Sequence, residues 1–472
     1  MIRFAPRSPR KSVILIRGLA GLMASILPFG PMHAEAPLPT GQSLVVGLDQ
    51  APGVAQAALK AHKPDVALRV ARGMLKADPA DGQAHYLAAL ARAAMDDRPG
   101  ATKAAQHAFR YAQSDEQRHQ AAHLAARLSF SDQRMTAAQF WLRRAVHNAP
   151  DAATRKATIR DFKAVRYSNP VALNLRFSVT PSDNVNNGSN SPYNLIDGSP
   201  LVGELSPSAQ AIAGIVGTMD LRGAYRLTRD DAAETSLTGR LYTRQVRFDD
   251  PVPGISGRDI SSVSLRLGVS HRRAGASDDS LWRVDITGGR TWYGGDGLYD
   301  SAKLGITRKQ VIDEGLTLTI GGSAEHQFDL TAPTSDSTVW QGFTAVGYEL
   351  PRGGEIGGAL HFRDVVNSGV NKASTQWTGT VSYTLGQQIG PAEIDLSLGY
   401  SVLDYDRYTV LIQVPGGRED KSTFGGVTAT FNDWSYLGFV PRVSLRAEKS
   451  RSNISRFDVD ETSLSLGFTS EF

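Results

Sequence analysis

The chain has 472 residues, enough for two or more domains, and it contains no cysteine. The lack of cysteine excludes a disulfide scaffold, a thiol enzyme and a lipidated cysteine. Five of the 51 basic residues and none of the 47 acidic residues lie in the first 34 positions, so the remainder carries 46 basic against 47 acidic side chains. This balance argues against a nucleic-acid-binding protein.

Residues 1–34 have the composition of a secretory signal peptide. A basic start is followed by an apolar run from Gly18 to Leu27 and then by Pro28 and small residues. We expect cleavage after Ala34, and residues 35–53 are interpreted as a linker. An anchor helix is the alternative, but the run is half the length of about 20 residues that a spanning helix needs. No later segment has that length, so any further membrane span has to be made of strands.

Residues 54–166 are predicted to form a periplasmic helical domain. They are rich in alanine and poor in β-branched residues, and apolar side chains recur every three to four positions. Helix-breaking segments divide the region into short helices. These breaks are 63–65, 78–79, 96–100, 114–115, 129–132 and 149–150.

Small or apolar side chains also repeat across the predicted helices. They come in pairs seven residues apart, at intervals of 34 and then 37 residues: Ala67 and Met74, Ala101 and Ala108, Ala138 and Ala145. A 34-residue period with alanine at the helix crossings resembles tetratricopeptide repeats, although the hallmark tryptophan and glycine of the first helix are absent. The concave face of such a stack commonly binds a peptide or protein. A plain helical bundle that serves as a spacer is the alternative.

Two histidines in this domain have a spacing that could chelate a metal. His119 and His123 are four residues apart on a predicted helix, but no third ligand is evident. We interpret them as part of a solvated helix face and predict neither a metal nor a cofactor.

Residues 167–472 are predicted to form a C-terminal antiparallel transmembrane β-barrel of about 14 strands. Alanine becomes less frequent here, and segments with a two-residue apolar period follow one another between turn residues. In 394–401, for example, every second residue is apolar. The chain ends on Phe472, an aromatic residue that resembles the end of the closing strand of a bacterial outer-membrane barrel. The expected strands are 171–180, 209–228, 233–248, 258–272, 279–292, 297–309, 315–328, 337–350, 355–366, 373–386, 391–403, 420–432, 436–450 and 455–472.

Strand length, aromatic placement and loop length favour a membrane barrel over a soluble β-domain, which is the alternative. Many segments exceed the 9–11 residues that cross the apolar layer. Trp282 and Trp292 share one strand face, about 33 Å apart along an untilted strand. Short inner turns alternate with several longer outer loops, and charged residues such as Arg283, Asp285 and Glu325 would line a wet interior.

Two stretches add a more specific resemblance. The first is Ser182-Asp183-Asn184-Val185-Asn186-Asn187-Gly188, and the second runs from Leu437 through Leu445 and Ser450 to Ile454. Together with the signal peptide, the helical repeats and the strand count, they resemble the surface lipoprotein assembly modulator (Slam) family. The resemblance covers nearly the whole exported chain in architecture and about fifty residues at the level of motifs.

The resemblance implies a translocation device in the outer membrane with its repeat domain in the periplasm. Its partners would be a client surface lipoprotein or secreted protein, periplasmic chaperones, the barrel assembly machinery and outer-membrane lipid. The candidate client contacts are Asp183, Asn184, Asn186 and Asn187. Asn and Asp also build tight loops, so a purely structural role is the favoured interpretation of these four residues, and their spacing matches no calcium loop.

Two other functions remain open. A pore for small solutes or for polysaccharide export would use the same architecture without a client protein. An outer-membrane hydrolase would need a nucleophile, base and acid in one place. No such grouping or catalytic motif is recognisable, and His271, His326 and His361 fall on different predicted strands, so we predict that the protein is not an enzyme.

Overall fold

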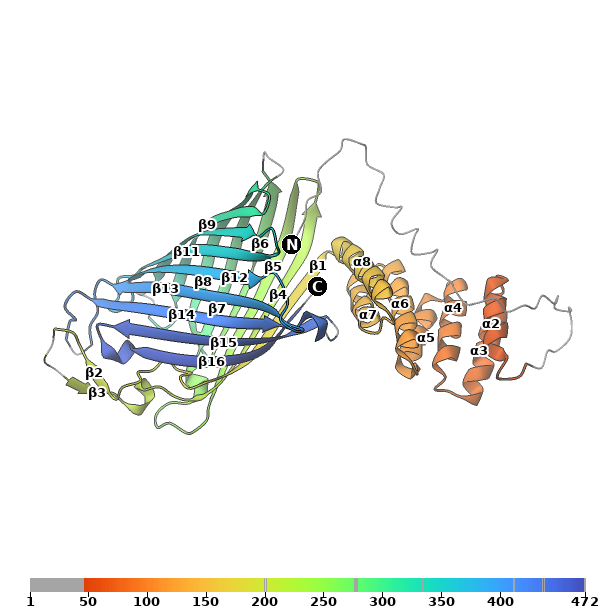
Figure 1. Ribbon diagram of the computed structural model, residues 1–472, viewed down its shortest axis with the longest axis horizontal. Coiled ribbons are helices and arrows are strands. Elements are labelled where there is room, and N and C mark those ends of the chain that lie inside the picture. The colour runs from red at the N-terminus through yellow and green to blue at the C-terminus, as the bar shows by residue number, and fades with distance from the viewer. Residues whose placement is uncertain are drawn as a thin grey trace. The chain divides into compact units, whose positions relative to one another are not determined.

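The computed structural model describes residues 46–198, 200, 202–275, 279–332, 335–410, 412–434, 436 and 438–470. The predicted signal peptide, most of the linker, Leu437 and Phe472 lie outside these residues. The described part of the chain holds seven α-helices followed by a closed β-barrel (Figure 1). The predicted fold class is therefore confirmed.

Short helices form the first part of the chain, and each packs on the next one in sequence. Four of them begin at a side chain that accepts hydrogen bonds from the first free backbone N–H groups: Asp81, Asp97, Ser114 and Asp151. The helices are α2 (Ala51–Lys60), α3 (Pro64–Ala77), α4 (Gly82–Ala94), α5 (Arg98–Tyr111), α6 (Asp115–Ser131), α7 (Met135–His147) and α8 (Ala152–Ser168).

The repeated alanines lie at the helix contacts, as expected. Ala67, Ala101, Ala138 and Ala145 have no exposed surface, and Ala108 is 2% exposed. A side chain this small lets neighbouring helix backbones approach closely. The core of the last helices is completed by Phe162 and Leu142, which pack with Ala126, Ala138 and Val165.

Two expectations for the helical domain are wrong. The predicted break at 129–132 falls mostly inside α6, because Ser129 Oγ donates to Ala125 O within the helix and does not end it. His119 and His123 do not lie on a solvated face: His119 Nδ1 is 2.8 Å from Ala145 O, and His123 Nε2 is 3.2 Å from Asp161 Oδ2. Both imidazoles therefore join α6 to its neighbours α7 and α8.

Fourteen antiparallel strands of the described chain form the barrel, in the order β1-β16-β15-β14-β13-β12-β11-β10-β9-β8-β7-β6-β5-β4. Each expected strand overlaps one of them. They are β1 (Val171–Ser182), β4 (Gly214–Arg229), β5 (Ala233–Phe248), β6 (Ser262–Ala274), β7 (Ser280–Tyr293), β8 (Asp296–Asp313), β9 (Leu316–Asp329), β10 (Ser337–Glu349), β11 (Gly354–Val366), β12 (Ser374–Leu385), β13 (Glu393–Tyr405), β14 (Arg418–Thr430), β15 (Phe439–Ser452) and β16 (Val459–Ser470).

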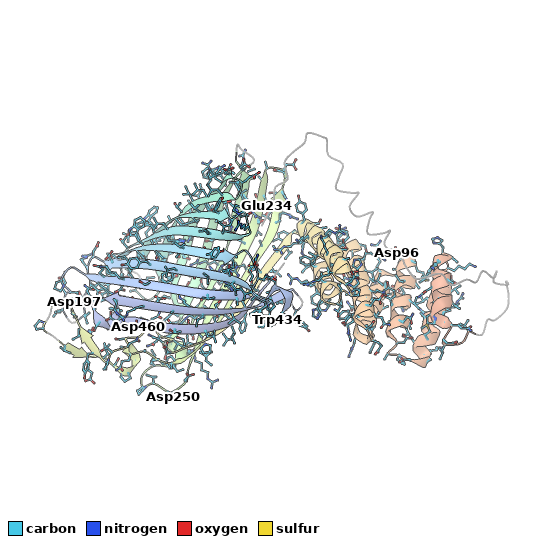
Figure 2. The ribbon with its side chains drawn as sticks, in the orientation of Figure 1. Asp96, Asp197, Glu234, Asp250, Trp434 and Asp460 are labelled. Atoms are coloured by element: carbon cyan, nitrogen blue, oxygen red, sulfur yellow. The ribbon has the colours of Figure 1, made fainter. Side chains whose placement is uncertain are left out.

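The barrel has two different rims. We call the end where β1 begins the turn rim and the end where β1 finishes the loop rim. Glu234 and Trp434 lie near the turn rim, and Asp197, Asp250 and Asp460 lie near the loop rim (Figure 2). The turn-rim connections are 230–232, 275–279, 314–315, 350–353, 386–392 and 431–438, and the loop-rim connections are 183–213, 249–261, 294–295, 330–336, 367–373, 406–417 and 453–458.

Two loop-rim connections have features that the sequence analysis did not predict. The connection 294–295 has only two residues, because Gly294 (φ 65°) and Gly295 (φ 100°) adopt the positive φ angles of a tight hairpin turn. The long connection 183–213 holds a separate two-stranded sheet, β2 (Tyr193–Leu195) and β3 (Val202–Glu204).

The strands have an apolar outer face and a polar inner face. Leu396, Leu398 and Tyr400 of β13 are exposed on the outside, where Leu398 is 62% exposed, while Ser401 on the inner face is 7% exposed. An unbroken β6–β7 register keeps Trp282 and Trp292 on one face. Such a wide apolar exterior is unfavourable in water and matches the hydrocarbon-facing band of an outer-membrane barrel.

A charge on this outer face is expected to destabilise the barrel much more than the same charge inside. Leu398→Arg, at the middle of β13, should lower the free energy of unfolding by about 2–4 kcal/mol in lipid vesicles, because arginine then faces hydrocarbon. Ser397→Arg, on the lumen face of the same strand, is the matched control and should change it little. Urea unfolding followed by tryptophan fluorescence measures both, and equal losses would contradict the assignment of faces.

The helical domain is expected to lose stability in mild acid. Burial lowers the pKa of the His119 imidazole below its usual value, although the bond to Ala145 O opposes this. In mild acid, the imidazole of the unfolded chain therefore binds a proton that the imidazole of the folded chain does not. The contribution of His119 to stability is present above a pH of about 6.5 and falls below it. Thermal melts at 222 nm should show a smaller loss between pH 7.5 and pH 5 in His119→Gln than in the wild type. An equal loss would exclude His119 as the cause.

Candidate transport path through the barrel

Three arginines lie directly opposite one another on the inner face of the barrel wall. Arg222 of β4 pairs in register with Arg240 of β5, and Arg240 pairs with Arg266 of β6. Like charges at directly opposite positions repel, so the row requires compensation. Asp220 supplies part of it, since its carboxylate accepts from Arg222 Nη2 and from Arg240 Nε, each at 2.8 Å.

A second carboxylate lies farther along the same wall. Glu325 of β9 is 5% exposed, and its oxygens lie 3.7 Å from Arg266 Nη2 and 3.7 Å from Lys303 Nζ. Gln327 donates to it at 3.0 Å. These partners compensate for the burial of the Glu325 carboxylate, because an unpaired buried charge would destabilise the fold.

These charges belong to a single surface. Arg222, Arg240, Arg266, Arg283 and Lys303 come from the five consecutive strands β4–β8 and line one cavity of the barrel interior. We call them the basic wall. Arg283 and Asp285 were expected to face a wet interior, and both do; Glu325 lies between Arg266 and Lys303.

The inner face of the other strands combines hydroxyl groups with a few charged side chains, among them the pair of Arg446 with Glu448 on β15. Many of the hydroxyls bond to each other across strands. Such bonds join Thr378 to Ser401, Ser422 to Ser450, Thr428 to Ser444 and Thr180 to Ser465. The positive charges that line the cavity are therefore concentrated on β4–β8, and hydroxyl pairs are frequent on the other strands.

The long connection 183–213 is held to the loops on both sides of β1. On one side, Arg244 of β5 donates to Val185 O at 2.7 Å and to Ile260 O at 2.9 Å. On the other side, Ile196 packs with Val414 and Ile454 in a buried cluster. The connection therefore fixes the loops 249–261, 406–417 and 453–458 to each other.

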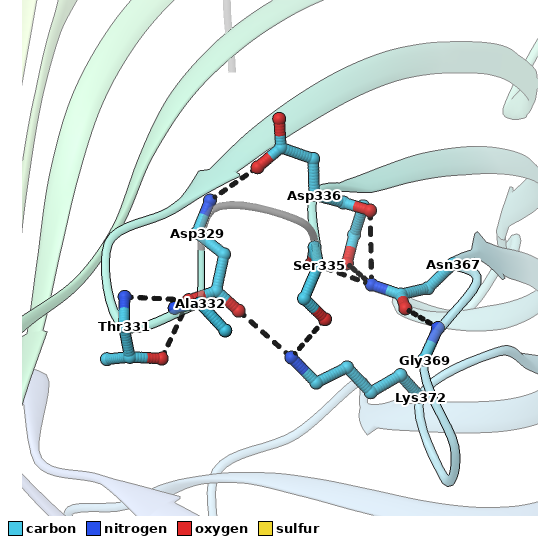
Figure 3. A network of polar contacts seen from close by, with 9 residues as sticks. Asp329, Thr331, Ala332, Ser335, Asp336, Asn367, Gly369 and Lys372 are labelled. Carbon is cyan, nitrogen blue, oxygen red and sulfur yellow. Dashed lines mark hydrogen bonds and ion pairs between the residues drawn. The ribbon is translucent and has the colours of Figure 1, made fainter.

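The loop-rim connections 330–336 and 367–373 are joined in the same way (Figure 3). Lys372 Nζ donates to Asp329 Oδ2 at 2.9 Å, and Asn367 Nδ2 donates to Ser335 O at 2.9 Å. These bonds tie the loop 367–373 to the loop 330–336. Asn371 in turn exchanges two bonds with the backbone of Thr409, in the loop 406–417. The loop rim is thus a continuous network of bonded loops.

The four residues predicted to contact a client have two different roles in this network. Asn184 is 2% exposed, and its amide both accepts from Gly188 N and donates to Gly188 O, each at 2.8 Å. The Asn186 amide bonds to the backbone of Gln210 and Ile212. These two residues hold the loop together. Asp183 and Asn187 are exposed, and Asn187 has a positive φ of 52°.

The end of the second family-like stretch meets the residues that follow the first stretch at the loop rim. Ile454, at the end of the second stretch, is fully buried and forms a β-bridge with Ile196. Ser189, just after the first stretch, donates from its hydroxyl to Ser455 O. Residues almost 270 positions apart therefore build one surface.

The row of Arg222, Arg240 and Arg266 was not predicted from the sequence. Each arginine lies at a polar position near the middle of its strand, which is a visible signal, but only the register shows that three of them are neighbours. His271, His326 and His361 lie on β6, β9 and β11, and the structure does not bring them together. Among the described residues, no group of three or more acidic, histidine or cysteine side chains is arranged to hold a metal ion. Within the same residues, no helix has the length and apolarity of a membrane span.

No protein-family model matches the chain, and no curated protein matches its sequence at a significant level. Solved structures similar to parts of it include the translocator chaperone SycD of the Yersinia enterocolitica type III secretion system, at 15% identity over 26% of this chain and 84% of SycD, with a TM-score of 0.24. A BenF-like porin from Pseudomonas fluorescens Pf-5 is 10% identical over 64% of this chain and 98% of the porin, with a TM-score of 0.33. A bacterial polysaccharide outer membrane secretin gives the same figures.

Removal of the Asn184 amide is expected to loosen the connection 183–213. Asn184→Ala leaves the N–H and C=O groups of Gly188 without these bonds, at about 1–3 kcal/mol for a buried polar group. Chymotrypsin should then cut the connection about tenfold faster or more in detergent-solubilised protein. Asp183→Asn, which changes an exposed neighbour, is the control and should be cut at the wild-type rate. No acceleration in Asn184→Ala would show that the amide does not hold the loop.

Proposed function

We propose that this protein is a translocation factor of the outer membrane that brings a client lipoprotein or secreted binding protein to the cell surface. The observation that carries the proposal is the fusion of a helical repeat stack to a barrel with a polar, charged lumen. A closed barrel of the outer-membrane type supplies a route through lipid, and a repeat stack supplies a surface for a polypeptide.

The helical part would recognise the client or a periplasmic chaperone. Its helices pack through alanine-lined contacts and the core around Phe162, and other side chains lie on its outer surface. Phe140 is 48% exposed, and the Arg144 guanidinium lies 3.5 Å from the centre of its ring. An exposed aromatic ring beside a cation is a common anchor for a bound peptide.

The barrel would provide the path and the loop rim its outlet. Asp183 and Asn187 are the candidate client contacts of the original four that remain accessible, because Asn184 and Asn186 bond within the loop. The barrel assembly machinery and outer-membrane lipid are the further partners of this proposal, and no step in it requires catalysis.

A pore for small solutes or for export of a polysaccharide is the second candidate. It is favoured by the basic wall, since a row of guanidinium groups attracts anions of any kind and not only those of a polypeptide. The two candidates differ in their prediction for the helical domain. A solute pore should work without residues 54–166, whereas a client-specific factor should not.

The test is surface display of lipoproteins by the bacterium that produces this protein. Deletion of the gene should leave at least one of them in the periplasm, where protease added to intact cells cannot reach it. A variant that keeps the signal peptide and barrel but lacks residues 54–166 should assemble in the outer membrane and fail in display. Unchanged display in the deletion strain would overturn the proposal, and normal display by the shortened variant would assign the function to the barrel alone.

A further inference from the structure

The basic wall carries more positive charge than its own carboxylates neutralise. Five basic side chains line it, and three carboxylates lie among them: Asp220, Asp285 and Glu325. Each carboxylate already has at least one cation at hydrogen-bond or ion-pair distance. The surplus of two positive charges therefore faces the lumen.

The guanidinium groups of the row are also accessible from the lumen. The side chains of Arg222 and Arg240 are 51% and 39% exposed, although both contact Asp220. Each guanidinium has five N–H donors, and one carboxylate shared between two of them cannot occupy all ten. Donors remain available for a second anion on the lumen side.

The spacing of the row suits an anion with several charged oxygens. Arg222, Arg240 and Arg266 lie on adjacent strands at paired positions, so their backbones are about 4.8 Å apart. Planar guanidinium forks at this spacing can bind neighbouring phosphate or carboxylate oxygens, two donors to each group.

Charged side chains are not needed to fill such positions in this barrel. Elsewhere, paired cross-strand positions are filled by hydroxyl groups such as those of Thr428 and Ser444, which bond at 3.0 Å without any charge. Three arginines at opposite positions instead repel one another and require Asp220 and Glu325 to offset the repulsion. The arrangement is more costly than its neutral counterpart in the same barrel.

We propose that Arg222, Arg240 and Arg266 form an anion-binding site in the lumen, for a solute or chain segment that carries clustered phosphate or carboxylate groups. The proposal goes beyond the translocation function and does not depend on it. A failure of lipoprotein display would leave anion binding unaffected, and a failure of anion binding would leave display unaffected.

The experiment is calorimetric titration of the full-length protein in non-ionic detergent at low salt, with tripolyphosphate and, in parallel, citrate. Wild-type protein should bind at least one of them, and the preferred probe distinguishes phosphate from carboxylate. Arg240→Gln, at the centre of the row, should weaken binding about tenfold or more, because it removes a charged hydrogen-bond donor and leaves the pair of Arg222 with Asp220. Arg240→Lys keeps the charge but loses the fork, and should give an intermediate affinity.

Arg290→Gln is the matched control. Arg290 lies on the outer face of β7, where it pairs with Asp300 at 2.6 Å, so its loss changes the net charge equally and should leave binding unchanged. Heat-modifiable migration confirms that each variant is folded. The proposal is overturned if the wild type binds neither probe, or if Arg240→Gln binds as the wild type does. An equal loss in Arg290→Gln would also overturn it, because general charge would then explain the binding.

Discussion

The whole C-terminal part of this protein depends on the closure of one sheet. Inside a membrane, each backbone N–H and C=O has to find its partner within the protein, and a sheet satisfies this only when its first strand pairs with its last. The pairing of β1 with β16, from Arg176 opposite Thr469 to Ser182 opposite Ser463, provides this closure. With both edges joined, all side chains must point either to lipid or to the lumen.

Closure also explains how a barrel can hold a charged row in its wall. The two-residue period that places Leu265 and Leu267 outside places Arg266 inside. Antiparallel register then brings residues from separate strands to the same level. The charges face a polar lumen, where Asp220 and Glu325 offset the repulsion, and the outer face of the same strands remains apolar.

At the loop rim and at the helix ends, side chains pair the backbone N–H and C=O groups that the strands of the barrel pair with each other. At the rim, the amides of Asn184, Asn186 and Asn367 bond to backbone groups that have no strand partner. In the helices, Asp81 and Ser114 do this for the first N–H groups, and alanine contacts provide the packing. The rim thereby becomes a single bonded network, and the helical domain has a core of its own.

The sequence by itself determined the fold class, the approximate bounds of all fourteen barrel strands and the alanine contacts of the helices. Apolar residues recur every two positions in a strand and close to every four in a helix. This spacing can be recognised in one segment without knowing which other segments pack against it. The sequence also indicated that Arg283 and Asp285 would face inward, since this requires only the phase of one strand.

Only the tertiary structure decided which residues meet across strands and loops. The adjacency of Arg222, Arg240 and Arg266 depends on the register of three strands, and the contact of Ile196 with Ile454 depends on how two distant loops fold. His119 and His123 had the spacing of exposed helical residues, but they lie between helices because α7 and α8 pack on that side of α6. Such contacts arise from closure of the barrel and from packing of helices and loops, and the spacing of residues within one segment does not reveal them.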